Sequence, residues 1–164
     1  SKKNKEEYGK FWENFGSTFK EGIHEDFTNK ESILKLSMFH SSSQKNWTTL
    51  NEYVERMPES QKEIYYISGE NKENLMKSPQ MENFIKNNVE VLFFTDPIDE
   101  FWLPNIDNFN NFKFKSVTKG DIDIKQSSSD KDNKKNNYKN FEKLIAYLKS
   151  FYGKKVKDVK VSSR

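Results

Sequence analysis

The sequence contains no cysteine, very little arginine and no long apolar run. Without cysteine the chain forms no disulfide, offers no thiol nucleophile and builds no thiolate zinc site. The only arginines are Arg56 and Arg164, so the bidentate guanidinium contacts that read phosphate and guanine are scarce. No segment is apolar for long enough to span a bilayer, and no signal peptide is recognisable. These absences argue against nucleic-acid and membrane partners.

The sequence does have many aromatic residues and an almost even charge balance. Hydrophobic residues make up 33% of the chain, yet 15% of all residues are aromatic, including 14 Phe. Aromatic side chains each bury a large area, so a core of Phe, Tyr, Ile and Leu is possible. The net charge of +3 over 164 residues creates no strong field for a polyanion. The length fits one domain with a helical appendage. Because the sequence starts without Met inside a charged helical pattern, we expect a fragment of a longer chain.

Residues 1–58 carry helical patterns. A stripe of aromatic residues predicts a first helix that ends near Gly22, and its members are Tyr8, Trp12, Phe15 and Phe19. Thr28 and Thr49 each precede a glutamate by three positions, which predicts two further helices that begin with capping boxes. The intervening residues 40–47 are predicted to form an exposed loop. We therefore expect a three-helix coil.

Residues 59–155 alternate between strand and helix patterns. The predicted strands cover residues 63–70, 89–94 and 112–118, the last of these at an edge of the sheet, and a final strand is predicted near the C-terminus over residues 156–162. Residues 125–137 are polar and of low complexity, which predicts a flexible linker. An amphipathic helix is expected over residues 138–152, closed by Gly153. Alternation of this kind is typical of an α/β fold, and we expect a small three-layer αβα domain with a mostly parallel sheet.

The stretch VEVLFFTDPIDEF places a cluster of acids directly after a strand. We interpret Asp96 as the N-cap of a short helix, with Pro97 at its first position and Asp99 and Glu100 in its first turn, where the helix dipole favours acids. The alternative is a free-standing αβα hydrolase that uses Asp96, Asp99 and Glu100 as catalytic acids. The lack of a nearby histidine and of a nucleotide-binding motif favours the structural interpretation.

Two large aromatic residues, Phe101 and Trp102, follow these acids. Neighbouring positions on a helix point about 100° apart, so we expect one ring in the core and the other at the surface, where it could bind apolar segments. The alternative is that both rings pack against the helix at 138–152. Elsewhere, His24, Glu25 and Asp26 are adjacent in the sequence, so they predict a turn rather than a metal site.

Five segments of the chain, in order, carry a family resemblance: GIHEDFTNKESILKL, YVERMPESQKEIYYISGENKENLMKSPQMENF, EVLFFTDPIDEF, FKSVTKGDIDI and VKDVKVSSR. Together they resemble the second half of the middle domain of the heat-shock protein 90 chaperones. The resemblance implies a helical coil over residues 1–58, a small αβα subdomain over residues 59–155, and the start of a C-terminal dimerisation domain at residues 156–164.

The resemblance also implies a function for the parent chain. Family members are ATP-driven dimeric clamps that assist unfolded or partly folded client proteins. Their ATP and Mg²⁺ site and their catalytic arginine precede the segment seen here, so no cofactor is expected within it. This segment would act as a lever arm and as a surface for clients and co-chaperones, next to the N-terminal ATPase and C-terminal dimerisation domains of a homodimer. The cytoplasm is the family default, and an organelle is the alternative.

The resemblance implies site residues as well. In family members the residues after the Ile-Asp-Glu motif face the cleft between protomers, where clients bind. That position corresponds to Glu100 and Phe101, and we add Trp102 as a candidate because it follows directly. Trp102 and Pro104 depart from the family pattern, which has smaller or polar residues there.

Overall fold

The computed structural model describes most of the chain, namely residues 2–106, 108–119, 131–153, 156 and 159. The chain forms two compact units, residues 1–122 and 123–164, and each is described by itself. Over the residues that the structure describes, no helix is long and apolar enough to cross a membrane.

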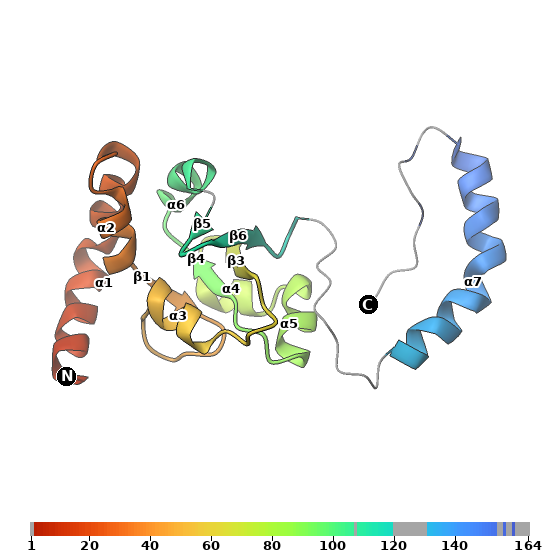
Figure 1. Ribbon diagram of the computed structural model, residues 1–164, viewed down its shortest axis with the longest axis horizontal. Helices are drawn as coiled ribbons and strands as arrows, with labels where there is room; N and C mark the ends of the chain where they lie inside the picture. The colour runs from red at the N-terminus through yellow and green to blue at the C-terminus, as the bar shows by residue number, and fades with distance from the viewer. Residues whose placement is uncertain (1, 107, 120–130, 154–155, 157–158, 160–164) are drawn as a thin grey trace. The chain divides into compact units, whose positions relative to one another are not determined.

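The first third of the chain contains the three predicted helices, α1 (Lys2–Glu25), α2 (Lys30–Leu36) and α3 (Leu50–Arg56). Helix α1 continues three residues beyond Gly22, where the sequence predicted its end. Gly22 instead allows α2 to approach closely, because a Cβ atom there would lie 2.8 Å from Ile33 Cδ1. Figure 1 shows α1 and α2 side by side.

Two short strands lie where the sequence predicted only helix and loop. Strand β1 (Met38–Ser41) pairs antiparallel with β2 (Thr48–Thr49), and His40 of β1 pairs with Phe93 of the neighbouring strand. The predicted exposed loop over residues 40–47 is therefore wrong at its first two residues. A strand of four residues is too short to show the alternating pattern of a strand. Its sequence therefore cannot be distinguished from a continuation of the preceding helix.

The described residues form one six-stranded sheet with the order β2-β1-β4-β3-β6-β5. Strands β4, β3 and β6 are parallel at its centre, and β1, β2 and β5 pair antiparallel around them. The α/β class is confirmed, with a mixed rather than a mostly parallel sheet. The remaining strands are β3 (Glu63–Ser68), β4 (Leu92–Phe94), β5 (Asn108–Phe109) and β6 (Phe112–Ser116).

Strand β6 is not at the edge of the sheet, because β5 covers it through a hairpin that the sequence analysis missed. The two residues of the turn, Asn110 and Asn111, have φ values of 49° and 68°. Two consecutive left-handed residues are typical of the type I′ turn, which matches the twist of paired strands, and asparagine tolerates this conformation.

Short helices connect β3 to β4 and β4 to β5. The first connection consists of α4, a 3₁₀ turn with Pro79 at its first position, and α5. The elements are α4 (Lys72–Met76), η1 (Pro79–Met81), α5 (Glu82–Lys86), α6 (Asp99–Trp102) and η2 (Leu103–Asn105).

The sheet of the first unit is covered on both faces, as a three-layer fold requires. On one face, Phe39 and Phe94 pack with their ring centroids 4.9 Å apart, in a core cluster that α1, α2, α3 and α6 complete. On the other face, the ring of Tyr65 lies 5.1 Å from that of Phe84 in α5. Alternate residues of each strand therefore serve two separate layers of helices.

The second unit contains α7 (Lys131–Tyr152). The helix ends where predicted, and Gly153 follows it with a φ of 49°, a left-handed conformation that glycine adopts without steric cost. It begins earlier than predicted, so residues 131–137 of the expected linker are helical. The rest of that linker, residues 125–130, and most of the strand predicted near the C-terminus lie outside the described residues.

Candidate functional site at the α1–α6 junction

The acid-rich stretch follows the carboxyl end of β4, a central parallel strand. The chain leaves β4 at Phe94, turns at Asp96 and Pro97, and enters α6 at Asp99. The turn is closed by the Asp99 N–H, which donates to the Asp96 carbonyl over 2.9 Å. Open α/β sheets place their functional loops at this end of their strands. Helix α6 is therefore positioned by the centre of the sheet.

One aromatic ring of α6 is buried and the other is exposed, as the helical geometry predicted. Trp102 is fully buried, and its ring lies 5.5 Å from that of Phe94 and 5.9 Å from that of Phe114. Phe101 keeps 61% of its surface exposed. Trp102 belongs to the core, so our prediction of Trp102 as a client-binding candidate does not fit its burial. Trp102 is buried by the sheet of its own unit. The alternative, that both rings pack against residues 138–152, concerns the second unit and stays a prediction.

A buried lysine of α1 meets the acids of α6. The ammonium of Lys20, a residue only 2% exposed, lies 2.7 Å from Asp96 Oδ2 and 2.9 Å from Asp99 Oδ1. It also sits 4.4 Å from the centre of the Phe39 ring, a cation–π arrangement. The indole N–H of Trp102 donates to Asp99 Oδ1 over 2.9 Å. We call Lys20, Asp96, Asp99 and Trp102 the Lys20 cluster.

The electrostatics of the Lys20 cluster are set by burial. Two carboxylates share one ammonium, so the cluster has one more acid than base. Burial raises the pKa of the Asp99 carboxyl above its usual range, and the Lys20 ammonium opposes part of that shift. Asp99 has no exposed surface, and both of its oxygens already accept hydrogen bonds. An acid held in this way cannot reach a substrate, so the geometry does not favour the hydrolase interpretation.

The helix caps were predicted with mixed success. Thr49 forms the predicted capping box, with its side chain accepting from Glu52 N–H and the Glu52 side chain accepting from Thr49 N–H. Thr28 is not a cap, because α2 begins after Asn29, and Asp26 accepts from the N–H groups of Thr28 and Asn29. The predicted turn around Asp26 is confirmed, and no side-chain hydrogen bond caps the start of α2.

Asp96 and Pro97 do not begin α6. The residue before its first turn is Ile98, which lacks a capping side chain, and Pro97 lies outside the helix. The Asp96 carboxylate instead accepts from Lys20. A lysine that is 76 residues distant in sequence competes for the same oxygens as the local N–H groups, and a charge-assisted bond is the stronger of the two.

The exposed Phe101 ring is adjacent to the end of α1. The imidazole of His24 lies 6.4 Å from the Phe101 ring in an edge-to-face arrangement. Glu100, the neighbour of Phe101, is also exposed. We call Phe101, Glu100 and His24 the Phe101 surface. It draws on two elements, α6 and α1, that the Lys20 cluster joins beneath it.

Sequence reasoning missed Lys20 and His24 as parts of this site. The aromatic pattern of α1 predicted Phe15 as a buried residue, whereas the buried face runs through Gly16, Lys20 and Ile23, and Phe15 is exposed. One signal was available: Lys20 falls four residues after Gly16 and three before Ile23, on a face that is otherwise small or apolar. A lysine there needs an acidic partner.

Among the described residues, no three histidine, aspartate or glutamate side chains gather in a way that could hold a metal ion. His24, Glu25 and Asp26 diverge at the end of α1, where His24 faces Phe101 and Asp26 caps the following turn. The α1–α6 junction therefore combines an exposed aromatic surface with a buried ionic cluster.

Comparisons with known proteins agree with this fold. The family model described as Hsp90 protein matches residues 1–164. The chain is 38% identical over 171 residues to the chaperone protein HtpG of Wolbachia pipientis, which covers 100% of this chain and 27% of the relative. It is 44% identical over 168 residues to the chaperone protein HtpG of Clostridium botulinum, covering 99% of this chain and 26% of that relative.

A solved structure shows the same likeness. The middle domain of a putative heat shock protein of Plasmodium falciparum superposes with a TM-score of 0.62 at 41% identity, over 68% of this chain and 47% of that one. A mixed α/β chain with a helical coil packed on its sheet is thus of the middle-domain class. The chain belongs to the Hsp90 family, and it spans about a quarter of the length of the curated relatives it matches.

Proposed function

We propose that this chain is the client-facing segment of an ATP-dependent chaperone, which binds non-native proteins through the Phe101 surface. The relatives with which it shares 38% and 44% identity are named chaperones. The observation that carries the proposal is the exposure of Phe101, 61%, beside a Trp102 that is fully buried. A large ring offered to solvent at the end of a central strand, with a charged neighbour, suits the capture of apolar segments.

The remaining roles follow from the family. The helices α1, α2 and α3 pack on the sheet and would transmit movement as a lever arm between an N-terminal ATPase domain and a C-terminal dimerisation domain. Clients and co-chaperones are the proposed partners, and a homodimer is the proposed working form. The sequence contains neither a P-loop nor a dinucleotide fingerprint. We therefore assign ATP and Mg²⁺ to another part of the full-length protein.

The experiment is a binding titration with the full-length protein. The probe is fluorescently labelled, reduced and carboxymethylated α-lactalbumin, which cannot fold. Phe101→Ala is expected to weaken binding about tenfold, the typical loss of an aromatic anchor. Phe15→Ala is the matched control, because Phe15 is also a phenylalanine with 58% of its surface exposed, but it lies on α1, where its ring stacks on that of Phe11.

The control is expected to bind the probe like the unmodified protein. Equal affinities of the unmodified protein and Phe101→Ala would overturn the assignment of the client surface. An equal loss in both variants would show that exposed phenylalanines act without regard to position.

A further inference from the structure

The Phe101 surface is assembled from two elements that are far apart in the sequence. Phe101 belongs to α6, and His24, whose ring is 6.4 Å away, belongs to α1. Helix α6 has only four residues, Asp99–Trp102. A single turn of helix has no stability of its own, because its few hydrogen bonds do not offset the entropy of ordering it. Something outside α6 must therefore hold its orientation.

Two anchors do this, and both lie on the buried face of the turn. Trp102 inserts into the aromatic core of the sheet, 6.3 Å from Phe39 and 5.5 Å from Phe94. Asp99 accepts from Lys20 Nζ over 3.1 Å through Oδ2, in addition to its 2.9 Å contact through Oδ1. Because Asp99 Oδ1 also accepts from the Trp102 indole N–H, the two anchors are coupled.

The lysine is itself fixed. Its ammonium lies between the two carboxylates and over the Phe39 ring, and the residue is 2% exposed. His24 follows Lys20 by one helical turn, on the same face of α1. One turn of α1 thus supplies both the buried cation that binds α6 and the exposed imidazole that contacts Phe101.

We propose that Lys20 is a positioning residue for client binding. Its ionic contacts with Asp96 and Asp99 hold the single turn of α6 against α1, and thereby fix Phe101 beside His24. The affinity of the Phe101 surface for clients then depends on a charge that no client touches. This inference rests on the proposed function of Phe101, and it adds that the orientation of α1 is coupled to the binding surface.

The test combines Lys20→Met with Phe101→Ala in the full-length protein, using the same α-lactalbumin probe at a temperature where every variant is folded. Methionine keeps the apolar stem of lysine and removes the charge. Lys20→Met alone is expected to weaken probe binding about threefold to tenfold. In the Phe101→Ala background it is expected to have no further effect, because the residue through which Lys20 acts is already gone.

Loss of stability must be separated from loss of position. Leu75→Ala is the matched control, because Leu75 is buried in α4, in the connection between β3 and β4, and its side chain packs against Gly69. The triple variant Lys20→Met/Asp96→Asn/Asp99→Asn removes the ionic contacts without leaving a buried charge unpaired, so it loses the positioning contacts at a smaller cost in stability. The control is expected to melt earlier with unchanged affinity. The triple variant is expected to melt later than Lys20→Met and still to bind the probe weakly.

A structural readout accompanies the titration. With ¹³C-labelled histidine, the His24 ring signal carries the ring current of Phe101, and the signal is assigned by its loss in His24→Ala. Lys20→Met is expected to move this signal toward its position in Phe101→Ala.

The outcomes separate the two proposals. If Phe101→Ala weakens binding but Lys20→Met and the triple variant do not, Lys20 is only structural and the inference is overturned. An additive loss in the double variant would overturn it as well. If Phe101→Ala leaves the affinity unchanged, the proposed function and the inference fail together.

Discussion

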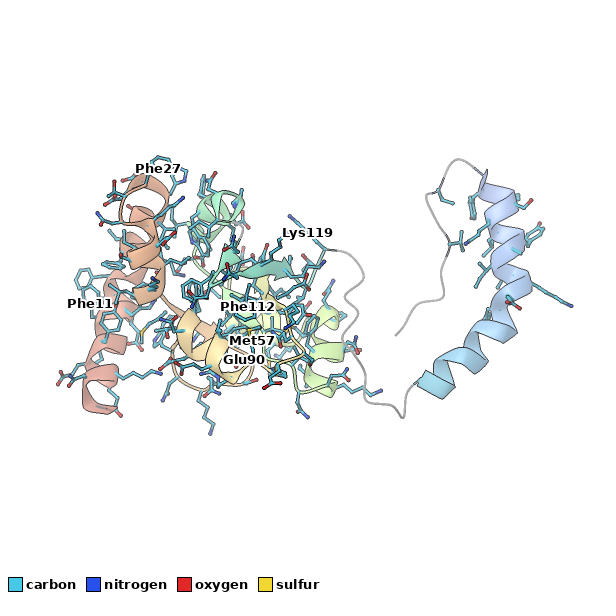
Figure 2. All side chains as sticks on the ribbon, viewed as in Figure 1. Phe11, Phe27, Met57, Glu90, Phe112 and Lys119 are labelled. Atoms are coloured by element: carbon cyan, nitrogen blue, oxygen red, sulfur yellow. The ribbon has the colours of Figure 1, made fainter. Side chains whose placement is uncertain are left out.

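Helices α1 and α3 are both tied to the sheet by polar side chains, but by opposite means. In α3 the neutral hydroxyl of Tyr53 accepts from the Tyr65 N–H over 3.1 Å and from the Gln61 amide over 3.0 Å, and it donates to the Glu90 carbonyl over 2.9 Å. In α1 the tie is the charged ammonium of Lys20. Figure 2 shows Glu90 below α3, at some distance from the α1–α2 tip that carries Phe27.

We call the contacts of Tyr53 the neutral joint and those of Lys20 the charged joint. The two differ in whether their charge changes with pH. The Tyr53 hydroxyl satisfies main-chain groups, and burial raises the pKa of Tyr53 well above its ordinary value, so it stays neutral at any physiological pH. The Lys20 cluster binds side chains, and its excess acid makes its charge depend on Asp99. The Tyr53 hydroxyl thus holds α3 without any charge, whereas the charge of the Lys20 cluster lies next to the surface that we propose for client binding.

The largest loss of stability is expected from a substitution that removes the charge of Lys20. Lys20→Met leaves Asp99 buried without its cation, and breaking a buried pair costs about 3–5 kcal/mol. Replacing all three charges in Lys20→Met/Asp96→Asn/Asp99→Asn is expected to recover most of this loss. Urea denaturation at pH 7 measures both. A triple variant as unstable as the single one would show that the lysine matters for its packing rather than its charge.

Lys20→Met is also expected to make the stability of the protein depend more strongly on pH. Burial raises the folded-state pKa of Asp99 above its unfolded value, so the folded protein holds this proton more tightly and its stability falls as pH rises through the raised pKa. Without Lys20 the shift is expected to grow. The destabilisation by Lys20→Met should therefore be smaller at pH 4.5 than at pH 7, which urea titrations at both pH values can measure. A constant difference would contradict the assigned cause.

The neutral joint is expected to give a smaller loss. Tyr53→Phe removes the hydroxyl and leaves the buried N–H of Tyr65 without its acceptor, at a cost of about 1–3 kcal/mol. The loss is expected to be the same at pH 5 and pH 8, because the lost group does not titrate in that range. Denaturation at the two pH values checks this, and a pH-dependent loss would show that the two joints are alike.

A histidine provides a third contact whose strength depends on pH. His40 of β1 stacks on Trp47 at 3.8 Å, and its Nδ1 has no hydrogen-bond partner among the described residues. Burial, aided by the charge of Lys72, lowers the pKa of His40. The unfolded chain therefore takes up this proton first, and stability is expected to fall as pH drops below about 6.5. His40→Phe should keep the stack and flatten this fall in thermal melts. An unchanged pH profile would exclude His40 as its source.

The smallest effects concern the helix caps. Thr49→Ala removes one half of the capping box of α3 and is expected to cost about 1 kcal/mol. Thr28→Ala is the paired control, because the side chain of Thr28 does not cap α2, and its main-chain N–H donates to Asp26. Its cost should stay within about 0.5 kcal/mol. Equal losses in thermal denaturation would reinstate the cap predicted from sequence.

Local patterns predicted the elements well where the chain decides them locally. Three features depend only on residues that are close together in the sequence. They are the capping box at Thr49, the strand at residues 63–68 and the end of α7 at Gly153. The helical geometry of α6 also predicted that one of Phe101 and Trp102 would be buried and the other exposed. The hairpin at Asn110 and Asn111 was equally local, and two asparagines between phenylalanines were its signal.

Long-range competition explains what the sequence analysis got wrong. Asp96 has the features of an N-cap, but Lys20 binds its carboxylate from across the fold. The buried face of α1 could not be chosen from the aromatic pattern alone, because Gly22 and the approach of α2 determine which side is covered. Strand β1 forms because β4 offers a free edge, which no pattern within residues 38–41 reveals.

The most direct test of the central claim places a photo-crosslinker at the proposed contact. The full-length protein would carry p-benzoylphenylalanine at position 101 or, as a control of similar exposure, at position 15. Irradiation with unfolded α-lactalbumin is predicted to give an adduct from position 101 that excess unlabelled α-lactalbumin abolishes, and little or none from position 15. No adduct from position 101, or equal adducts from both positions, would contradict the assignment of Phe101 as the client contact.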